Sequence, residues 1–247
     1  YIESIGDSVM EYRFIRSTVM IALIGILPSM VGAKYFNQEY LGIEVIQTNQ
    51  NFKSRFGDKI FHKNPQNFNV FGGFNFTKHF GLEAGYEFQP NRSKDVELVQ
   101  GDYVPNPDGT GLITAGQQVL SQSHYKMYMP YLGLFINAAT KNFEYKALLG
   151  AAFSHANAQY TLDVYNNGVY SPPTITRSYS QSKVVPIVKL MSTGFVTPNF
   201  GIRVSLQYIN TSQFKMTADQ TNAVGSKALV KMTDSYGIGL GVIYTFG

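Results

Sequence analysis

Residues 236–246 read Y-G-I-G-L-G-V-I-Y-T-F, and this stretch decides the fold. Every second residue from Tyr236 to Phe246 is apolar or aromatic, and most of the residues between them are glycines. Side chains of a β-strand point alternately to the two faces of its sheet. The pattern therefore predicts a strand with one apolar face, bearing aromatic rings, and one face that is nearly bare.

The same alternation recurs upstream. Residues 67–76 alternate Phe and Val with Asn and Gly, and residues 80–88 alternate large apolar side chains with Gly and Glu. Three segments open with a tight polar turn and enter an alternating strand through a Phe: K-H-F-G-L-E-A-G-Y-E-F from Lys78, K-N-F-E-Y-K-A-L-L-G-A-A-F from Lys141 and P-N-F-G-I-R-V-S-L-Q-Y from Pro198. Turn residues between alternating segments predict antiparallel hairpins.

The connections at the other ends of these segments are long. They cover residues 50–66, 90–123, 163–180 and 212–228. Three short turns and four long loops between alternating segments predict eight strands, and this asymmetry is typical of bacterial outer-membrane barrels. Closing the sheet into a barrel also removes edge strands, whose backbone groups would be unpaired in lipid.

Alternation alone does not say which face is outside, because a soluble barrel alternates too, with its apolar face inward. Charged residues make up only 15% of the chain, against roughly 25% in soluble domains. The polar face is rich in Gly, Ser and Asn, which suits a narrow lumen. Aromatic residues cluster near strand ends, as in membrane-interface girdles: Phe80, Phe143 and Phe200 after the short turns, and Tyr86, Phe88, Phe153 and Tyr208 at the far ends. We therefore predict an all-β fold, an eight-stranded antiparallel up-and-down transmembrane β-barrel.

The N-terminal region is interpreted as an export signal. Residues 10–33 hold Arg13 and Arg16, then an apolar run too short for a transmembrane helix, then V-G-A, a pattern that signal peptidase cleaves. Cleavage after Ala33 would leave residues 34–247 as the barrel, and an uncleaved amphipathic anchor is the alternative. Residues 1–9 do not fit a signal peptide and are interpreted as a non-native leader.

Ions of both signs occur on the predicted inner face. They are Glu44, Glu83, Glu87, Glu144, Lys146, Lys189 and Arg203. Buried charges are stable only when paired, so we predict a salt-bridge network that plugs the lumen. The alternative is a wet cavity in which these ions pair loosely. Pro130 and Pro186 interrupt otherwise good strands, and we predict a bulge or strand end near the outer rim at each.

The stretch G-G-F-N-F-T-K-H-F-G-L-E-A-G-Y-E-F from Gly72 and the C-terminal G-I-G-L-G-V-I-Y-T-F resemble the small barrel domains of the outer membrane protein A and X type. The resemblance covers nearly all of residues 34–247. It implies an outer-membrane location and a role as anchor, adhesin, surface antigen or minor channel. It also implies that Tyr244 and Phe246 belong to the signal read by the barrel-assembly machinery.

Enzymatic, metal and nucleic-acid functions have little support. The four histidines are His62, His79, His124 and His155. In the pairs Ser123-His124 and Ser154-His155 the neighbours should point to opposite faces, which argues against a Ser-His-acid triad. A lipid A-modifying enzyme remains the less favoured alternative. The chain has no Cys, no His spacing typical of a metal site and no basic stripe, so we expect no cofactor, no metal and no nucleic acid.

The first long loop combines cations with aromatic residues. Lys53, Arg55, Lys59 and Lys63 lie among phenylalanines and are candidates for contacts to lipopolysaccharide phosphates. An ordinary solvated loop is the alternative. The other long loops are candidate contacts for host or phage surface molecules. The favoured function is a surface-exposed structural or interaction protein, and the second is a narrow channel for small solutes or apolar molecules.

Overall fold

The fold is a closed antiparallel barrel of eight strands in a computed structural model that describes residues 38–50, 59–106, 109–211, 215–216, 230–232 and 234–246. The predicted leader and signal peptide lie outside the described residues. Around the barrel the strands follow the order β1-β12-β9-β8-β7-β6-β3-β2. Their bounds are β1 Glu39–Asn49, β2 Gln66–Asn75, β3 Phe80–Leu98, β6 Gln117–Ala139, β7 Phe143–Asn166, β8 Val169–Phe195, β9 Phe200–Ile209 and β12 Ser235–Phe246. The predicted fold is confirmed.

Two small hairpins lie outside the barrel. β4 (Tyr103–Asn106) pairs with β5 (Gly109–Leu112), and β10 (Lys215–Met216) pairs with β11 (Val230–Lys231). No helix in the described part of the chain is long and apolar enough to cross a membrane.

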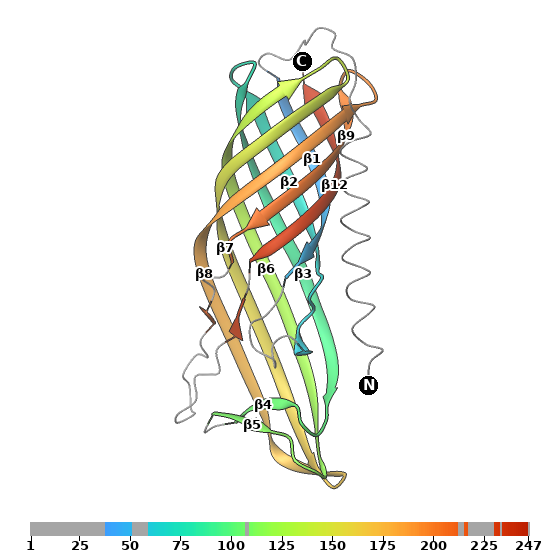
Figure 1. The fold of residues 1–247 in the computed structure, drawn as a ribbon, viewed down its shortest axis with the longest axis vertical. Coiled ribbons are helices and arrows are strands. Elements are labelled where there is room, and N and C mark those ends of the chain that lie inside the picture. Colours follow the sequence, from blue (N-terminus) through green and yellow to red (C-terminus); the bar gives the residue numbers. More distant parts are fainter. Residues whose placement is uncertain are drawn as a thin grey trace.

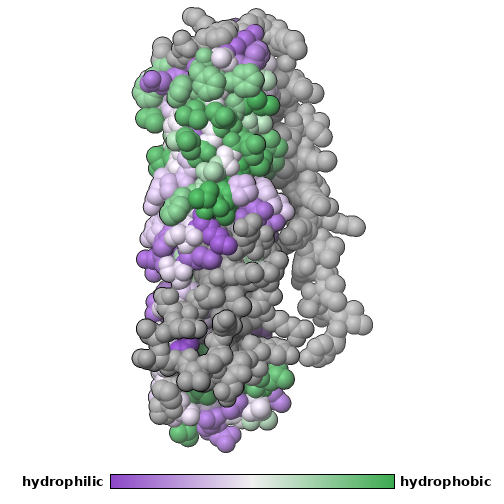
Figure 2. Space-filling view, turned by 90° about the vertical axis from the view of Figure 1, so that its left-hand side faces the viewer, coloured by the Kyte–Doolittle hydropathy of each residue, from purple (hydrophilic) through white to green (hydrophobic). Residues whose placement is uncertain are grey.

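The outer wall of the barrel is apolar. In β12 the side chains of Tyr236 to Phe246 at even positions face outward, and Leu240 is 62% exposed. The other barrel strands carry similar exposed side chains, among them Ile43, Val70, Leu134, Leu149, Leu190 and Ile202. Figure 2 shows a band of hydrophobic residues on one face of the closed part of the barrel, with a hydrophilic zone next to it. The predicted assignment of faces is correct, since an apolar belt of this extent requires a hydrocarbon environment.

The inner face is less bare than the glycines suggest. Phe71 points inward and lies, in the strand register, between Gly42 on β1 and Gly85 on β3. A Cβ atom on Gly42 would collide with the Phe71 ring. Glycines thus leave space for large inward side chains of neighbouring strands, which is how a lumen of eight strands is filled to native density.

The three short turns share one local structure. Each has the sequence Thr-x-x-Phe, at residues 77–80, 140–143 and 197–200. In each turn the Thr hydroxyl accepts a hydrogen bond from the backbone N–H of the Phe, at 2.9, 3.2 and 3.0 Å respectively. Short polar side chains stabilise turns by such local bonds. The three short turns predicted from the sequence are confirmed, and all lie at one end of the barrel (Figure 1).

Two of the predicted long loops are largely strand. β3, β6, β7 and β8 continue far beyond the other four strands and form an outer sheet extension (Figure 1). β7 and β8 join through a two-residue turn, Asn167-Gly168, with φ angles of 51° and 80°. Asn-Gly is the preferred pair for such a turn. The interpretation of 90–123 and 163–180 as loops was wrong because the outward face of this extension is polar, so the outward apolar residues that mark the barrel strands end while the strands do not.

The two strand prolines lie at different kinds of site. β8 continues through Pro186, which pairs with Ala151 on β7 without a register shift, so the predicted bulge or strand end is wrong there too. The ladder with β9 ends one residue away, at Ile187 with Ile209, so Pro186 needs no backbone donor on that side. The β6–β7 ladder omits Pro130 but resumes in the same register at Tyr131, so the predicted bulge or strand end there is wrong. The missing N–H of Pro130 creates a gap in the ladder without a shift.

Candidate functional site

The lumen is the first candidate site, and it contains all seven ionic residues expected there. Each is at most 4% exposed. Three ion pairs form: Arg203 Nη1 lies 2.9 Å from Glu83 Oε2, Lys189 Nζ lies 3.2 Å from Glu44 Oε2, and Lys146 Nζ lies 3.1 Å from Glu144 Oε2. The first two pairs join strands that are not neighbours in the barrel, so their side chains cross the lumen.

The side chains of the Glu83–Arg203 pair are fully enclosed. Tyr40 donates a hydrogen bond from its hydroxyl to Glu83 Oε2 at 2.8 Å, and Tyr131 donates one to Glu83 Oε1 at 3.0 Å. The Arg203 guanidinium lies 4.1 Å from the centroid of the Phe71 ring, within cation–π range. The Glu83 carboxylate is therefore hydrogen-bonded from several sides, whereas Arg203 is held by one charged hydrogen bond and the aromatic ring, and its Nε and Nη2 have no hydrogen-bond partner among the described residues.

A second cluster adjoins this pair. Glu44 accepts hydrogen bonds from Asn69 at 3.1 Å and from the hydroxyl of Ser205, in addition to its ion pair with Lys189. Lys189 Nζ also lies 3.5 Å from the Tyr131 hydroxyl. Tyr131 thus links the two clusters into one network across the lumen.

Glu87 and Glu144 have different surroundings. Among the described residues no cation forms an ion pair with Glu87, and amide groups of Asn67 and Gln207 donate to it at 2.6 and 3.1 Å. Glu144 accepts from Asn137 at 3.0 Å and pairs with Lys146, whose amine lies 3.8 Å from the Tyr40 ring centroid. The expected salt bridge of Glu87 is thus replaced by hydrogen bonds to amides.

We predict that Gly85→Ala destabilises the barrel by about 1–3 kcal/mol, the usual cost of overpacking. A Cβ on Gly85 would lie 2.5 Å from Tyr131 Cε1, and the hydroxyl of Tyr131 is held by Glu83. Urea unfolding of the purified barrel would measure the loss. The control is Gly72→Ala, whose Cβ meets the end of the flexible, outward Leu41 side chain. Equal stability of Gly85→Ala and wild type would contradict the prediction.

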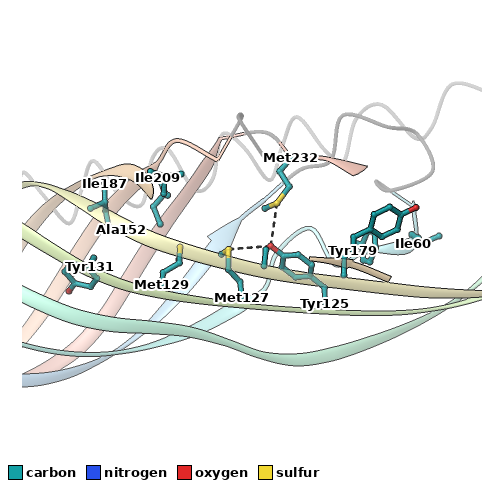
Figure 3. Packing of buried hydrophobic residues seen from close by; sticks show 14 of the residues in the cluster. Ile60, Tyr125, Met127, Met129, Tyr131, Ala152, Tyr179, Ile187, Ile209 and Met232 are labelled. Carbon is teal, nitrogen blue, oxygen red and sulfur yellow. Dashed lines mark hydrogen bonds between the residues drawn. The ribbon is translucent and has the colours of Figure 1, made fainter. Parts of the chain in front are cut away.

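Beyond the ionic layer the interior holds apolar side chains together with buried polar ones such as Gln50 and Gln89. Met127, Met129, Ile187 and Ile209 are each at most 2% exposed. Figure 3 shows Tyr125 among the methionines: its hydroxyl lies 3.5 Å from Met127 Sδ and 3.7 Å from Met232 Sδ. Side chains therefore fill the described interior from the ionic layer to the level at which the outer sheet extension begins.

The buried apolar cluster of the lumen continues into the outer sheet extension. Ile60 and Phe61, on the segment that follows β1, are at most 1% exposed, and Phe61 packs edge-on against Tyr125 at 6.1 Å between ring centroids. Tyr160 and Tyr179 stack at 5.8 Å on the neighbouring strands. Residues 59–63, which we call the strap, therefore cover the inner face of the extension.

The strap is also tied by polar contacts. Lys94 Nζ donates to the carbonyl oxygens of Phe61, at 3.3 Å, and of Lys59. Lys59 pairs with Asp102. Burial acts to raise the pKa of Asp102, but the hydrogen bonds from Lys59 and from the backbone N–H of Val99, together with the charge of Lys59, lower it below its usual value.

The predicted lipopolysaccharide contacts have different positions. Lys53 and Arg55 lie outside the described residues. Lys59 is engaged by Asp102, and Lys63 lies in the strap. Within the described part of the chain, Lys59 is therefore bound to the protein itself, and its role toward lipid stays a prediction.

The histidines form no triad in the described structure. His124 Nδ1 lies 3.2 Å from Ser93 Oγ, and His155 Nδ1 lies 2.6 Å from Ser182 Oγ, but no described carboxylate bonds to either imidazole. Ser123 and Ser154 are buried while their histidine neighbours are half-exposed, so the predicted opposite orientation is correct. No group of three or more His, Asp or Glu side chains that could hold a metal ion occurs among the described residues.

Tyr244 and Phe246 lie on the outer wall at the end of the barrel that carries the short turns. Their rings are 5.1 Å apart in an edge-to-face arrangement, and both are exposed. Their use as an assembly signal stays a prediction, since no contact within the chain reports on it.

A closed eight-stranded barrel with an apolar outer wall and a filled polar lumen defines the class of small bacterial outer-membrane barrels. The model of the OmpA-like transmembrane domain matches residues 34–247, and the chain belongs to this family. The protein is thus an integral protein of the bacterial outer membrane. A search of curated protein sequences gave no significant match.

Solved structures with a similar fold have low sequence identity. Ail, the attachment invasion locus protein of Yersinia pestis, is 16% identical, with 85% of this chain and 99% of that chain covered and a TM-score of 0.48. The outer membrane protein OprG from Pseudomonas aeruginosa is 11% identical, with 88% and 99% covered and a TM-score of 0.47. Neisserial surface protein A is 14% identical, with 84% and 97% covered and a TM-score of 0.40.

Proposed function

We propose that the protein is a closed, surface-exposed barrel that acts as an adhesin-like interaction protein through its outer sheet extension. The proposal rests on the division of the molecule into a barrel inside the apolar belt and a sheet extension beyond it. The part inside the apolar belt has a filled interior, while four strands continue well beyond the belt and carry the buried apolar cluster of the lumen with them. Rigid scaffolds that present variable outer segments are common sites of intermolecular contact.

The filled lumen argues against transport. Glu83, Arg203, Glu44 and Lys189 are 2% exposed or less and cross the interior as ion pairs, and an apolar layer lies next to them. Solute passage would require these pairs to separate in a confined space, which is costly. A plugged lumen is thus favoured over the wet cavity and over the narrow channel, the second candidate function.

The far end of the extension carries exposed apolar side chains. They are Val99, Leu112, Leu120, Val169 and Tyr170, from four different strand ends and turns. We call this set the tip. On the side of the belt that faces the extension, the visible surface is hydrophilic (Figure 2). Exposed apolar side chains far from the membrane fit contacts with host or phage surface molecules.

The proposal also includes two partners of the barrel itself, lipopolysaccharide and the barrel-assembly machinery. Lys53, Arg55, Lys59 and Lys63 would contact lipopolysaccharide phosphates, and Tyr244 and Phe246 would engage the barrel-assembly machinery. We propose no enzymatic activity, and release of an acyl chain from lipid A by the purified protein would contradict this.

The experiment compares a tip variant with wild type. Leu120→Ser, Val169→Ser and Tyr170→Ser together should abolish adhesion of expressing bacteria to cultured epithelial cells, and the purified wild type should give no stable conductance in planar bilayers. The matched control places serine at Lys78 and His79, in an exposed turn at the opposite end. Unchanged adhesion of the tip variant would reject the tip as the interaction surface, and a large stable conductance would favour the channel.

A further inference from the structure

The outer sheet extension presents a broad outward face formed by β3, β6, β7 and β8. Leu98 on β3 and Leu162 on β7 are buried, at 0% and 1% exposure, so their neighbours Glu97 and Asp163 point outward. Asp95, two residues before Glu97, lies on the same face. Asp95 and Glu97 are exposed and Asp163 is half-exposed, so all three carboxylates are available to a partner.

This face is acidic from the row of Asp95 outward. Its described residues include Asp95, Glu97 and Asp163 but neither Lys nor Arg, and Arg177 pairs with the buried Tyr160 on the inner face. None of the three carboxylates forms an ion pair with a described residue. The whole chain has a net charge of +4, so the negative charge of this face is a local feature and not a consequence of composition.

An exposed apolar side chain lies between two of the carboxylates. In the strand register Leu120 on β6 pairs with Glu97 on β3 and with Asp163 on β7, and it is 42% exposed. Neighbouring strands are about 4.8 Å apart, which separates the Cα atoms of Glu97 and Asp163 by about 10 Å, and Asp95 lies about 7 Å along β3 from Glu97. A single small cation cannot contact carboxylates so far apart. An extended segment with an apolar side chain between basic ones matches this pattern.

A pair of tyrosines adjoins Asp163. Tyr165 on β7 pairs with Tyr170 on β8, and their ring centroids lie 5.6 Å apart with 57° between the ring planes. The Thr174 hydroxyl donates to Asp163 Oδ1 at 2.6 Å, so the Tyr170 hydroxyl donates to Thr174 Oγ1, at 2.5 Å. Tyrosine faces attract cations, and guanidinium groups both stack on such rings and bond to carboxylates. The pair therefore suits an Arg or Lys side chain that reaches Asp163.

Hydrogen bonds within the face orient two of the carboxylates and leave them able to bind. Asp163 accepts from Thr174 through Oδ1, and Glu97 accepts from the side chain of Gln118 through Oε1. The second oxygen of each carboxylate accepts from no donor in the described part of the chain. A partner would thus meet acceptors that a sheet already holds in place, which lowers the entropy lost on binding.

We propose that this surface, the acidic face, binds an extended basic segment of a partner protein. The acidic face consists of Asp95, Glu97, Leu120, Asp163, Tyr165 and Tyr170. An extended chain rises about 3.3 Å per residue, so basic side chains two or three residues apart match the separations of the carboxylates. The inference rests on the proposed function, since it names the chemistry of the partner that the outer sheet extension contacts.

The test measures binding of labelled peptides to the folded full chain in a neutral detergent by fluorescence anisotropy. The probes are a synthetic peptide that alternates Arg with Leu and Gly, its counterpart with Glu in place of Arg, and tetramethylammonium chloride as a competitor. Detergent micelles without protein give the background. Heat-modifiability gels establish that each variant is folded.

The test variant combines Glu97→Gln with Asp163→Asn, which keeps an oxygen acceptor for Gln118 and Thr174. The matched control combines Glu39→Gln with Asp234→Asn, which removes the same charge at positions outside the acidic face. A second variant, Tyr165→Leu, removes one ring of the tyrosine pair and keeps an apolar side chain there.

Wild type should bind the Arg peptide at least about tenfold more tightly than the Glu peptide, and the test variant should lose at least about tenfold while the control keeps its affinity. Tyr165→Leu should lose about two- to fivefold. Raising the salt from about 0.05 M to about 0.15 M should weaken wild type more than the test variant, because screening acts on the charges that the variant lacks.

Equal binding of the two peptides, or an equal loss in the control, would overturn the proposal. Displacement of the Arg peptide by millimolar tetramethylammonium would overturn the assignment to an extended segment, and unchanged affinity of Tyr165→Leu would overturn the role of the tyrosine pair. Adhesion that is lost in the tip variant, without peptide binding by wild type, would support the adhesin proposal and overturn this one. Peptide binding together with unchanged adhesion of the tip variant would do the reverse.

Discussion

The variant Glu83→Ala is expected to lose about 3–5 kcal/mol of folding stability, because it leaves a buried cation without its partner. Arg203 is fully buried, and its Nη1 lies 2.9 Å from Glu83 Oε2. The hydroxyls of Tyr40 and Tyr131 would also lose the carboxylate that accepts their hydrogen bonds. Urea titration followed by the fraction of the fast-migrating, folded band on unheated gels would measure the loss.

The control removes both charges. Glu83→Leu combined with Arg203→Met leaves no buried ion, and we expect it to recover most of the stability that Glu83→Ala loses, since buried ion pairs are close to neutral against apolar side chains of similar volume. If Glu83→Ala were as stable as wild type, Arg203 would have to find another anion or water in the lumen, and the sealed ionic layer would be refuted.

Much of this ionic layer could be predicted from the alternation of inward and outward side chains along each strand. Glu83 and Arg203 alternate with large apolar residues in 80–88 and 200–208, so their position on the inner face follows from strand geometry. The presence of both signs on that face predicted pairing. Which anion meets which cation did not follow, because Glu83 and Arg203 lie on β3 and β9, and the stagger of the strands sets their relative height.

The tyrosines show where sequence patterns are insufficient. Tyr40 and Tyr131 point inward and donate to Glu83, whereas Tyr86 and Tyr244 point outward. Aromatic residues in such a chain suggest interface girdles. Only the register against Gly73 and Gly85, where a Cβ would collide with these rings, shows that the lumen has space for them.

The outer sheet extension was missed for another reason. Once the strands leave the membrane, their outward face meets water, and the outward apolar residues that identified the barrel strands end. The pair Asn167-Gly168 did carry a local hairpin signal. The strap could not be predicted, because Ile60 and Phe61 reach the extension only through tertiary packing.

The variant Phe61→Ala is expected to destabilise the outer sheet extension by about 3–5 kcal/mol while the barrel stays folded. Phe61 is 1% exposed and packs against Tyr125, at the position where the strap covers the extension. Its removal opens a cavity between the two. Hydrogen exchange of the amides in β6 and β7 should then accelerate beyond Tyr125 and Ala158, but not within the belt.

The contrast with Glu83→Ala tests whether the molecule has two cores. Glu83→Ala should lower the stability of the whole barrel, whereas Phe61→Ala should leave the folded, fast-migrating band unchanged and increase only protease cleavage of the extension. The control Phe153→Ala removes an aromatic ring of the same size from the lipid-facing wall, where it is 51% exposed, and should not alter exchange in the extension. If Phe61→Ala unfolded the barrel and the extension together, the strap, the extension and the lumen would form one cooperative unit. The prediction that the extension unfolds independently of the barrel would then be wrong.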